Sequence, residues 1–103
     1  MAAKKKSRYI ICRSNMGVHS GVLDEAKSTE TVKVLLKPRR LWRWHSRFTL
    51  TELALEGPVK PDQCKFSAEG PTTEITSPTN GFEILECTDA AMKAILAVPA
   101  CQP

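Results

Sequence analysis

The sequence predicts a small α+β fold: an antiparallel β-sheet of about six strands, arranged as a meander plus a hairpin, with two short helices. Three observations lead to this expectation. Short β-prone segments alternate with turns, a capping-box pattern marks a helix start, and an Asn-Gly pair separates two further β-prone segments. A chain of 103 residues suffices for one domain. We expect a basic tail over 1–7, a single domain over 8–98 and a short tail over 99–103.

The first half of the chain is expected to form a four-stranded antiparallel meander. Gly21 lies inside the second β-prone segment, where a glycine is typical of a bulge or a close approach of two backbones. Pro38 has no amide hydrogen, so we expect it to end the third strand. The expected strands are Arg8–Arg13, Val18–Glu25, Thr31–Lys37 and Arg39–His45.

Two short helices are expected in the second half. In Thr49-Leu50-Thr51-Glu52, the first threonine hydroxyl and the glutamate carboxylate can satisfy free amides of a first helical turn. Gly57-Pro58 ends that helix after about two turns. Thr88 can cap a last helix over Asp89–Ala97.

A hairpin is expected between these helices. Pro78-Thr79-Asn80-Gly81 separates the β-prone segments Thr72–Ser77 and Phe82–Cys87, and Asn-Gly accepts the positive φ angles of a tight turn. The preceding residues, 59–71, are expected to form a loop in which Lys65-Phe66 is a candidate to return to the sheet.

The net charge of +4 hides an uneven distribution. Residues 1–47 carry 12 Lys/Arg and 3 Asp/Glu, a net charge of +9, whereas residues 48–103 carry 3 and 8, a net charge of −5. A basic half favours an anionic partner, and an oppositely charged half favours pairing between copies, so we expect a homo-oligomer. No stretch of about 18 apolar residues exists, so no membrane partner is expected.

Cysteines and histidines give no sign of a metal site, a cofactor or catalysis. The four cysteines are too far apart in sequence for a zinc knuckle, and we expect reduced thiols, with Cys12 a small buried residue. We assign no catalytic role to either histidine, and no serine lies in a nucleophile motif. The sequence therefore predicts a protein that is not an enzyme and that holds no metal and no cofactor.

The segment Lys37–Phe48 is the most distinctive part of the chain, because it holds both tryptophans and five of the 15 positive charges. A guanidinium offers a planar set of donors that matches phosphate, and an indole offers a face on which a nucleobase stacks. The alternative, in which one or both tryptophans cover the sheet and the arginines are solvated neighbours or cation–π partners, stays open. Strand alternation puts Arg40, Trp42 and Trp44 on one face and Arg39, Leu41, Arg43 and His45 on the other.

These residues define a predicted ligand-binding site. Arg13 follows the first strand and has two possible roles, as a further phosphate ligand or as the ion-pair partner of an acid in the second half. The candidate ligand-binding residues are Arg13, Arg39, Arg40, Trp42, Arg43, Trp44 and Arg47.

Several blocks resemble a family of roughly 100-residue uncharacterised proteins that are encoded mostly by tailed bacteriophages and prophages. The resemblance covers about Tyr9 to Val98, and its distinctive parts are Arg-Arg-Leu-Trp-x-Trp at 39–44 and Leu-Ala-x-Glu-Gly at 53–57. The chain departs from it in the N-terminal lysines and in residues 45–48, so Arg47 is a weaker candidate than Arg39 or Arg40. The resemblance implies a non-structural role in the cytoplasm of an infected bacterium.

Three functions are compatible with these observations. The first is a non-enzymatic phage protein that binds and sequesters a small phosphate-bearing nucleotide, for example a cyclic oligonucleotide immune signal, and so counters host antiviral signalling. The second is a module that binds single-stranded nucleic acid through charge and stacking. The third is an adaptor or inhibitor that binds a host protein through tryptophan and arginine.

Overall fold

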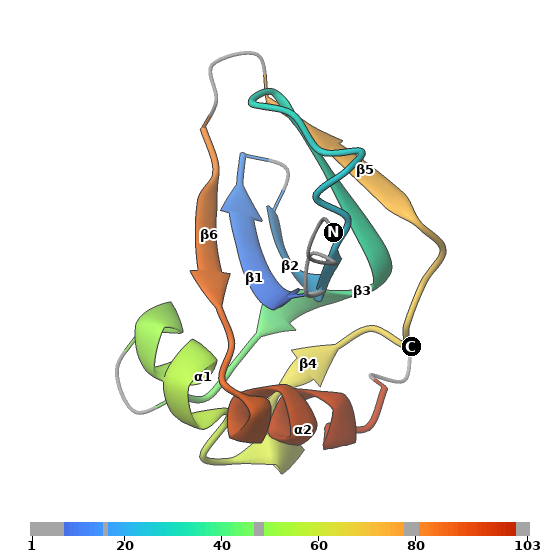
Figure 1. Ribbon diagram of the computed structural model, residues 1–103. Helices are drawn as coiled ribbons and strands as arrows, with labels where there is room; N and C mark the ends of the chain where they lie inside the picture. The colour runs from blue at the N-terminus through green and yellow to red at the C-terminus, as the bar shows by residue number, and fades with distance from the viewer. Residues whose placement is uncertain (1–7, 16, 47–48, 78–80, 101–103) are drawn as a thin grey trace, which may run out of the picture.

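The computed structural model describes residues 8–15, 17–46, 49–77 and 81–100, which form a sheet and a layer of short helices (Figure 1). This arrangement confirms the predicted small α+β fold. The elements in chain order are β1 (Arg8–Ser14), β2 (Gly17–Leu23), β3 (Val32–Arg43), α1 (Leu50–Glu56), the 3-10 turn η1 (Pro61–Gln63), β4 (Lys65–Phe66), β5 (Thr73–Thr76), β6 (Glu83–Glu86) and α2 (Asp89–Ala97).

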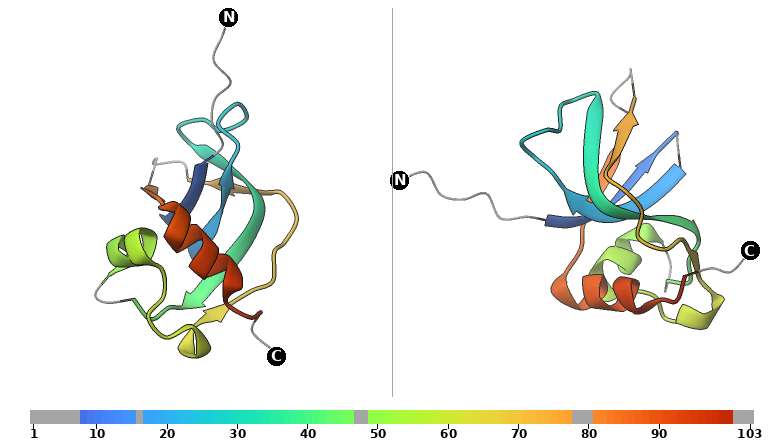
Figure 2. Two further views of the ribbon diagram at one scale, coloured as in Figure 1. Left: turned by 60° about the horizontal axis from the view of Figure 1, so that its bottom comes forward. Right: turned by 90° about the vertical axis from the view of Figure 1, so that its right-hand side faces the viewer.

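The long strand β3 organises the sheet. The strand order is β4-β3-β2-β1-β6, with all pairs antiparallel. β5 also pairs with β3, through Val32–Leu35, whereas β4 pairs with it at Leu41 and Arg43. The helices lie together on one side of the sheet, at the end where β3 finishes (Figure 2). Among the described residues, no helix is long and apolar enough to cross a membrane.

Pro38 does not end a strand, so the prediction of two strands over 31–45 was wrong. β3 runs through Pro38 without interruption, because the proline lies at a bulge where two residues of β3 face Gly21 of β2. A bulge leaves one residue out of the hydrogen-bond ladder, so the missing amide hydrogen costs little there. Lys37 has a φ of +48° at this point. The predicted close approach at Gly21 is confirmed, since an added Cβ would lie 3.1 Å from Pro38 Cα.

The predicted hairpin of residues 72–77 and 82–87 was also wrong. β5 pairs with β3 and β6 pairs with β1, so the two strands lie at different places in the sheet. The Asn-Gly pair is a local signal, and it carries no information about these distant partners. Lys65-Phe66 does return to the sheet, as β4.

Both helices begin where the sequence predicts. The Thr49 hydroxyl accepts a hydrogen bond from the Thr51 amide, and the Glu52 carboxylate accepts one from the Thr49 amide at 2.9 Å. The Thr88 hydroxyl caps α2 by accepting a hydrogen bond from the Ala91 amide. The predicted tail at 1–7 lies outside the described residues.

Apolar side chains are buried on both faces of the sheet. Tyr9 and Ile11 of β1 pack on the helix-covered face with Leu41, Leu53 and other residues, whereas their neighbours Ile10 and Cys12 pack on the opposite face. This alternation follows from the two-residue period of a strand. The face on which each residue of β3 lies therefore decides which of the two clusters it can join.

Candidate functional site

Arg39 lies inside the protein, although the sequence predicted it as a ligand-binding residue. Its side chain is 3% exposed. Nε donates to the Ser67 carbonyl and Nη1 donates to the Ile95 carbonyl, both at 2.6 Å, and the guanidinium lies 5.4 Å from the centre of the Phe66 ring. Burial lowers the pKa of Arg39. The Ile95 carbonyl, in the last turn of α2, accepts both the bond from Arg39 and one from the Val98 amide, so Arg39 ties this helix to the sheet.

Arg40 and Trp42 lie on the other side of β3 and are exposed. Arg40 pairs with His19 of β2, which in turn pairs with Cys12, so these three side chains share the face opposite the helices. Trp42 is 58% exposed, the largest value for a large hydrophobic residue in the described part of the chain. An exposed indole beside an exposed guanidinium is the pair of groups that the sequence predicted.

A second bulge changes the face of Trp44. Leu41 pairs with Phe66, but Arg43, rather than Trp42, pairs with Lys65, so β3 has an extra residue here. A shift of one residue turns the following side chain to the opposite face. Trp44 accordingly packs against the helix-covered core instead of lying beside Trp42. The predicted face was therefore wrong for Trp44 and for Arg43, which is exposed.

Four exposed side chains form what we call the β3–β4 basic surface: Arg40, Trp42, Arg43 and Lys65. Its three cations form no ion pair with any described residue. The ion pairs among the described residues involve Arg8 and Arg13 instead. Beside it is a shallow hollow of about 490 Å³, lined by Arg43, Asp62, Gln63, Cys64 and Lys65. The sequence analysis missed Lys65, which only the return of β4 to the sheet brings beside Arg43.

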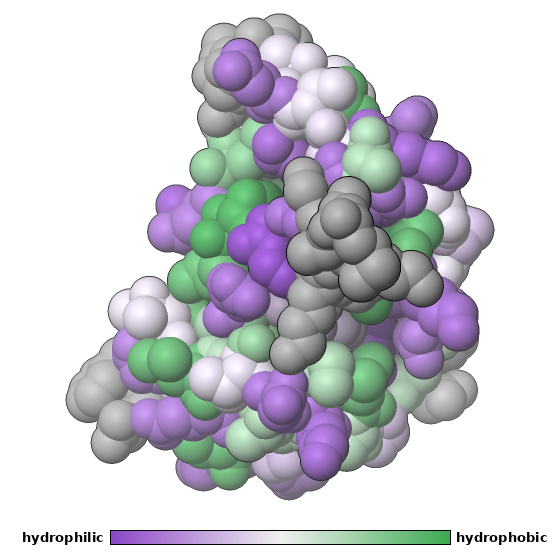
Figure 3. Space-filling model, in the orientation of Figure 1, coloured by the Kyte–Doolittle hydropathy of each residue, from purple (hydrophilic) through white to green (hydrophobic). Residues whose placement is uncertain are grey.

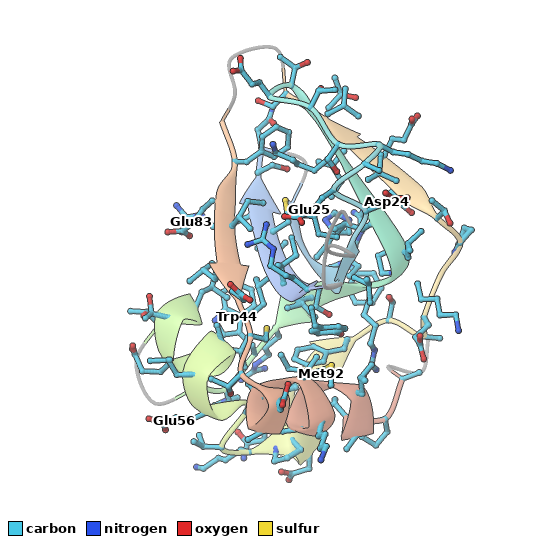
Figure 4. The ribbon with its side chains drawn as sticks, viewed as in Figure 1. Asp24, Glu25, Trp44, Glu56, Glu83 and Met92 are labelled. Carbon is cyan, nitrogen blue, oxygen red and sulfur yellow. The ribbon has the colours of Figure 1, made fainter. Side chains whose placement is uncertain are left out.

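Arg13 and Trp44 are brought together in a different place. They line a hollow of about 440 Å³ together with Thr49, Leu50, Thr51 and Glu83. Trp44 and Glu83 are labelled in Figure 4, between the sheet and α1 and on β6 respectively. Arg13 Nε lies 3.8 Å from Glu83 Oε1, so the alternative role of Arg13, as a partner of an acid from the second half, is confirmed. Arg47 lies outside the described residues.

Burial shifts the pKa values of one histidine and two cysteines. Burial, together with the nearby charge of Arg40, lowers the pKa of His19, and its Nδ1 has no hydrogen-bond partner among the described residues. Burial raises the pKa of Cys12 to about 11 and that of Cys87 to about 12, so both thiols stay protonated at neutral pH. Cys12, Cys64 and Cys87 are free thiols.

The other exposed hydrophobic residues do not accompany Trp42. Leu55 and Leu96 belong to the helices, and Val59 follows α1. Figure 3 shows apolar residues along β6 and over the helices, interrupted by hydrophilic ones. Trp42 is therefore set apart by its surroundings, because cations lie on its own strand and on the neighbouring strand.

Comparison with known proteins identifies a family without a known function. Neither the curated proteins nor the solved structures contain a match to this chain. The bacteriophage origin that the resemblance implies, and the link between the Arg-Arg-Leu-Trp-x-Trp block and a family, stay predictions. A family model does match residues 6–95, which is most of the chain, and the protein thus belongs to the family described as "Domain of unknown function (DUF6948)".

Proposed function

We propose that this protein is a non-enzymatic binder of single-stranded nucleic acid, and that the β3–β4 basic surface is its binding site. The observation that carries this proposal is a half-exposed tryptophan among three cations without ion-pair partners in the described residues. Phosphates would lie against Arg40, Arg43 and Lys65, and a base would stack on Trp42.

The charge of this surface suits a phosphate backbone. Arg8 and Arg13 pair with carboxylates, whereas Arg40 and Arg43 pair with none among the described residues. A ligand therefore does not have to displace a carboxylate from Arg40 or Arg43. Asp62, near Arg43, is the acidic residue of the adjacent hollow. Three phosphate contacts on a single strand predict that the logarithm of the affinity falls with the logarithm of the salt concentration with a slope of about −2.

The exposed indole of Trp42 is better placed to stack on a nucleobase than to pack in the core. Burying an indole is strongly favourable, so a position that leaves it 58% exposed leaves much apolar area for a partner. Stacking of one base on such a ring contributes about 1–3 kcal/mol. The ring offers its face to any base, so we expect little sequence preference.

The open shape favours a strand over an enclosed small nucleotide. The four side chains lie along an exposed strand and its short neighbour, an arrangement that a linear ligand can follow. Sequestration of a cyclic oligonucleotide in the cytoplasm of an infected bacterium requires an enclosed site, which a second copy of the chain would have to complete. This function and the predicted homo-oligomer stay predictions. Titration with cyclic dinucleotides and light scattering test them.

Fluorescence anisotropy with a labelled oligothymidine of roughly 12 nucleotides tests the proposed function. The full chain should bind it at about 50 mM salt, with affinity decreasing as salt rises. Trp42→Ala should weaken binding at least about fivefold through loss of stacking. Arg43→Ala should weaken binding and also make the salt dependence shallower by about 0.7.

Lys27→Ala is the matched control, because Lys27 is an exposed cation in the turn after β2. It removes the same charge elsewhere and should change affinity and salt dependence much less than Arg43→Ala. Absence of binding at low salt, or equal effects of the Lys27 and Arg43 variants, would overturn the proposal. Binding of a cyclic nucleotide without binding of the oligonucleotide would favour the sequestration function instead.

A further inference from the structure

The hollow that contains Arg13 and Trp44 is separate from the β3–β4 basic surface. Its lining comes from β1, from the residue after the end of β3, from the start of α1 and from the first residue of β6. These segments are distant in sequence, and only the fold assembles them. Its volume of about 440 Å³ is in the range of small-molecule sites, roughly 300–1,000 Å³.

The hollow combines an apolar wall with a charged rim. Trp44 contributes an indole that is held by its packing against the core, and Leu50 is 7% exposed. Thr51, which is exposed, adds a hydroxyl, whereas the Thr49 hydroxyl already contacts Glu52 in the helix cap. An aromatic ring of a ligand could thus lie on Trp44 while its polar groups face the rim.

Arg13 is available to an anionic ligand because its ion pair is loose. Nε lies 3.8 Å from the Glu83 carboxylate, and the two side chains are 64% and 54% exposed. Exposed pairs of this kind are weak, because water screens both charges. A phosphate accepts two hydrogen bonds from a guanidinium and carries more charge than a carboxylate, so it is able to replace Glu83.

We propose that this hollow binds one nucleoside monophosphate, with its base on Trp44 and its phosphate on Arg13 in place of Glu83. The ligand chemistry is that of the proposed function, but the residues are different. The oligonucleotide experiment depends on Trp42 and Arg43, whereas the present proposal depends on Arg13 and Glu83. Either proposal can consequently fail while the other holds.

Adenosine 5′-monophosphate and inorganic phosphate are the probes. In a ¹⁵N NMR titration of the full chain, the nucleotide should shift the indole signal of Trp44 more than that of Trp42. Glu83→Gln should tighten nucleotide binding about fourfold or more, because it removes a negative charge close to the phosphate. Arg13→Gln should weaken it at least about tenfold. Inorganic phosphate should bind more weakly, since it has no base to stack.

Both variants change exposed side chains, so they should fold even though replacement of Trp44 could disturb the core. Lys27→Gln is the charge-matched control and should leave the affinity unchanged. The proposal is overturned if millimolar nucleotide leaves the Trp44 signal in place, or if Glu83→Gln weakens binding. It is also overturned if Arg43→Gln weakens binding as much as Arg13→Gln does, because the nucleotide would then occupy the β3–β4 basic surface.

Discussion

The two sides of β3 near its end contain the same kinds of residue in opposite environments. Arg39 and Trp44 lie on the helix-covered side, where the arginine is 3% exposed and the tryptophan packs against the core. Arg40 and Trp42 lie on the other side and are exposed. The difference between these pairs comes from strand alternation and two bulges, because the residue types are the same.

This comparison shows that one arginine–tryptophan cluster can place some of its residues in the core and leave the others exposed. The inner arginine donates to the Ile95 carbonyl of α2 and to the Ser67 carbonyl after β4, and the inner tryptophan fills space beside the helices. The outer pair has no such role in the fold. Variants on the inner side should therefore change stability, and variants on the outer side should change binding.

The largest effect on stability is expected from Arg39→Ala. The substitution leaves the Ser67 and Ile95 carbonyls without their charged donor and opens a void beside Phe66. The free energy of unfolding should fall by about 3 kcal/mol or more, as expected for the loss of two charge-assisted hydrogen bonds. Urea denaturation measures it.

Arg40→Ala is the control for this prediction, since it removes the adjacent arginine from the exposed side. It should change the free energy of unfolding by less than about 0.5 kcal/mol. Arg39→Lys should lie in between, because an ammonium group keeps the charge but not the planar pair of donors. Equal effects of the two alanine variants would mean that Arg39 does not tie α2 to the sheet.

A smaller effect is expected from Gly21→Ala, which would disturb the bulge that sets the register of β3. The new Cβ would lie 3.1 Å from Pro38 Cα and 3.2 Å from the Leu36 carbonyl oxygen, and backbone atoms yield little. We expect a loss of about 1–3 kcal/mol in urea denaturation.

Gly70→Ala is the matched control, because its Cβ would approach the same proline at an ordinary distance of 3.6 Å from the carbonyl oxygen. It should be nearly neutral. If Gly21→Ala is neutral as well, the close approach of β2 and β3 does not constrain the bulge.

Stability should also decrease in mild acid because of His19. Its pKa is lowered below the ordinary value of 6.5, first by burial and then by Arg40, so the unfolded chain binds the proton more readily. The stabilising contribution is complete above about pH 6.5 and is lost as the pH falls toward the lower pKa of the folded state. Denaturation between pH 8 and pH 5 should show this loss.

His19→Gln should remove this part of the pH dependence, whereas His45→Gln should leave it in place. Arg40 and Cys12 are the cross-strand neighbours of His19, and Cys12 stays protonated in this range. An unchanged profile in the His19 variant would assign the acid sensitivity to other groups.

Local sequence signals were sufficient for much of the fold. The caps of α1 and α2 and the pairing of the first two strands depend on residues that are close in sequence, and each is found where it was expected. The partners of β5 and β6 could not be predicted in this way. Each pairs with a strand from the first half of the chain, so its position depends on the packing of the whole sheet.

The candidate site could be predicted only in part, because it also depends on residues that are distant in sequence. Alternation correctly separated Arg39 and Leu41 from Arg40 and Trp42. It failed after Trp42, because an unpredicted bulge opposite β4 inserts one residue. The hydrogen-bond partners of Arg39 lie 28 and 56 residues away, so no local pattern could show that this arginine is buried.

The smallest expected effect is a difference in fluorescence between the two tryptophans, and it compares the two sides of β3 most directly. Trp42→Phe leaves Trp44 as the chain's single tryptophan, and Trp44→Phe leaves Trp42. The emission of Trp42 should be at longer wavelength, and iodide should quench it more strongly than caesium does, because the surrounding cations concentrate anions. This preference should decrease as salt is added, while Trp44 should be quenched weakly by both ions.

Trp42→Phe should leave the free energy of unfolding within about 0.5 kcal/mol of the original value. If both tryptophans were quenched alike, the second bulge would not separate them, and the basis for assigning Trp42 to a ligand and Trp44 to the core would be lost.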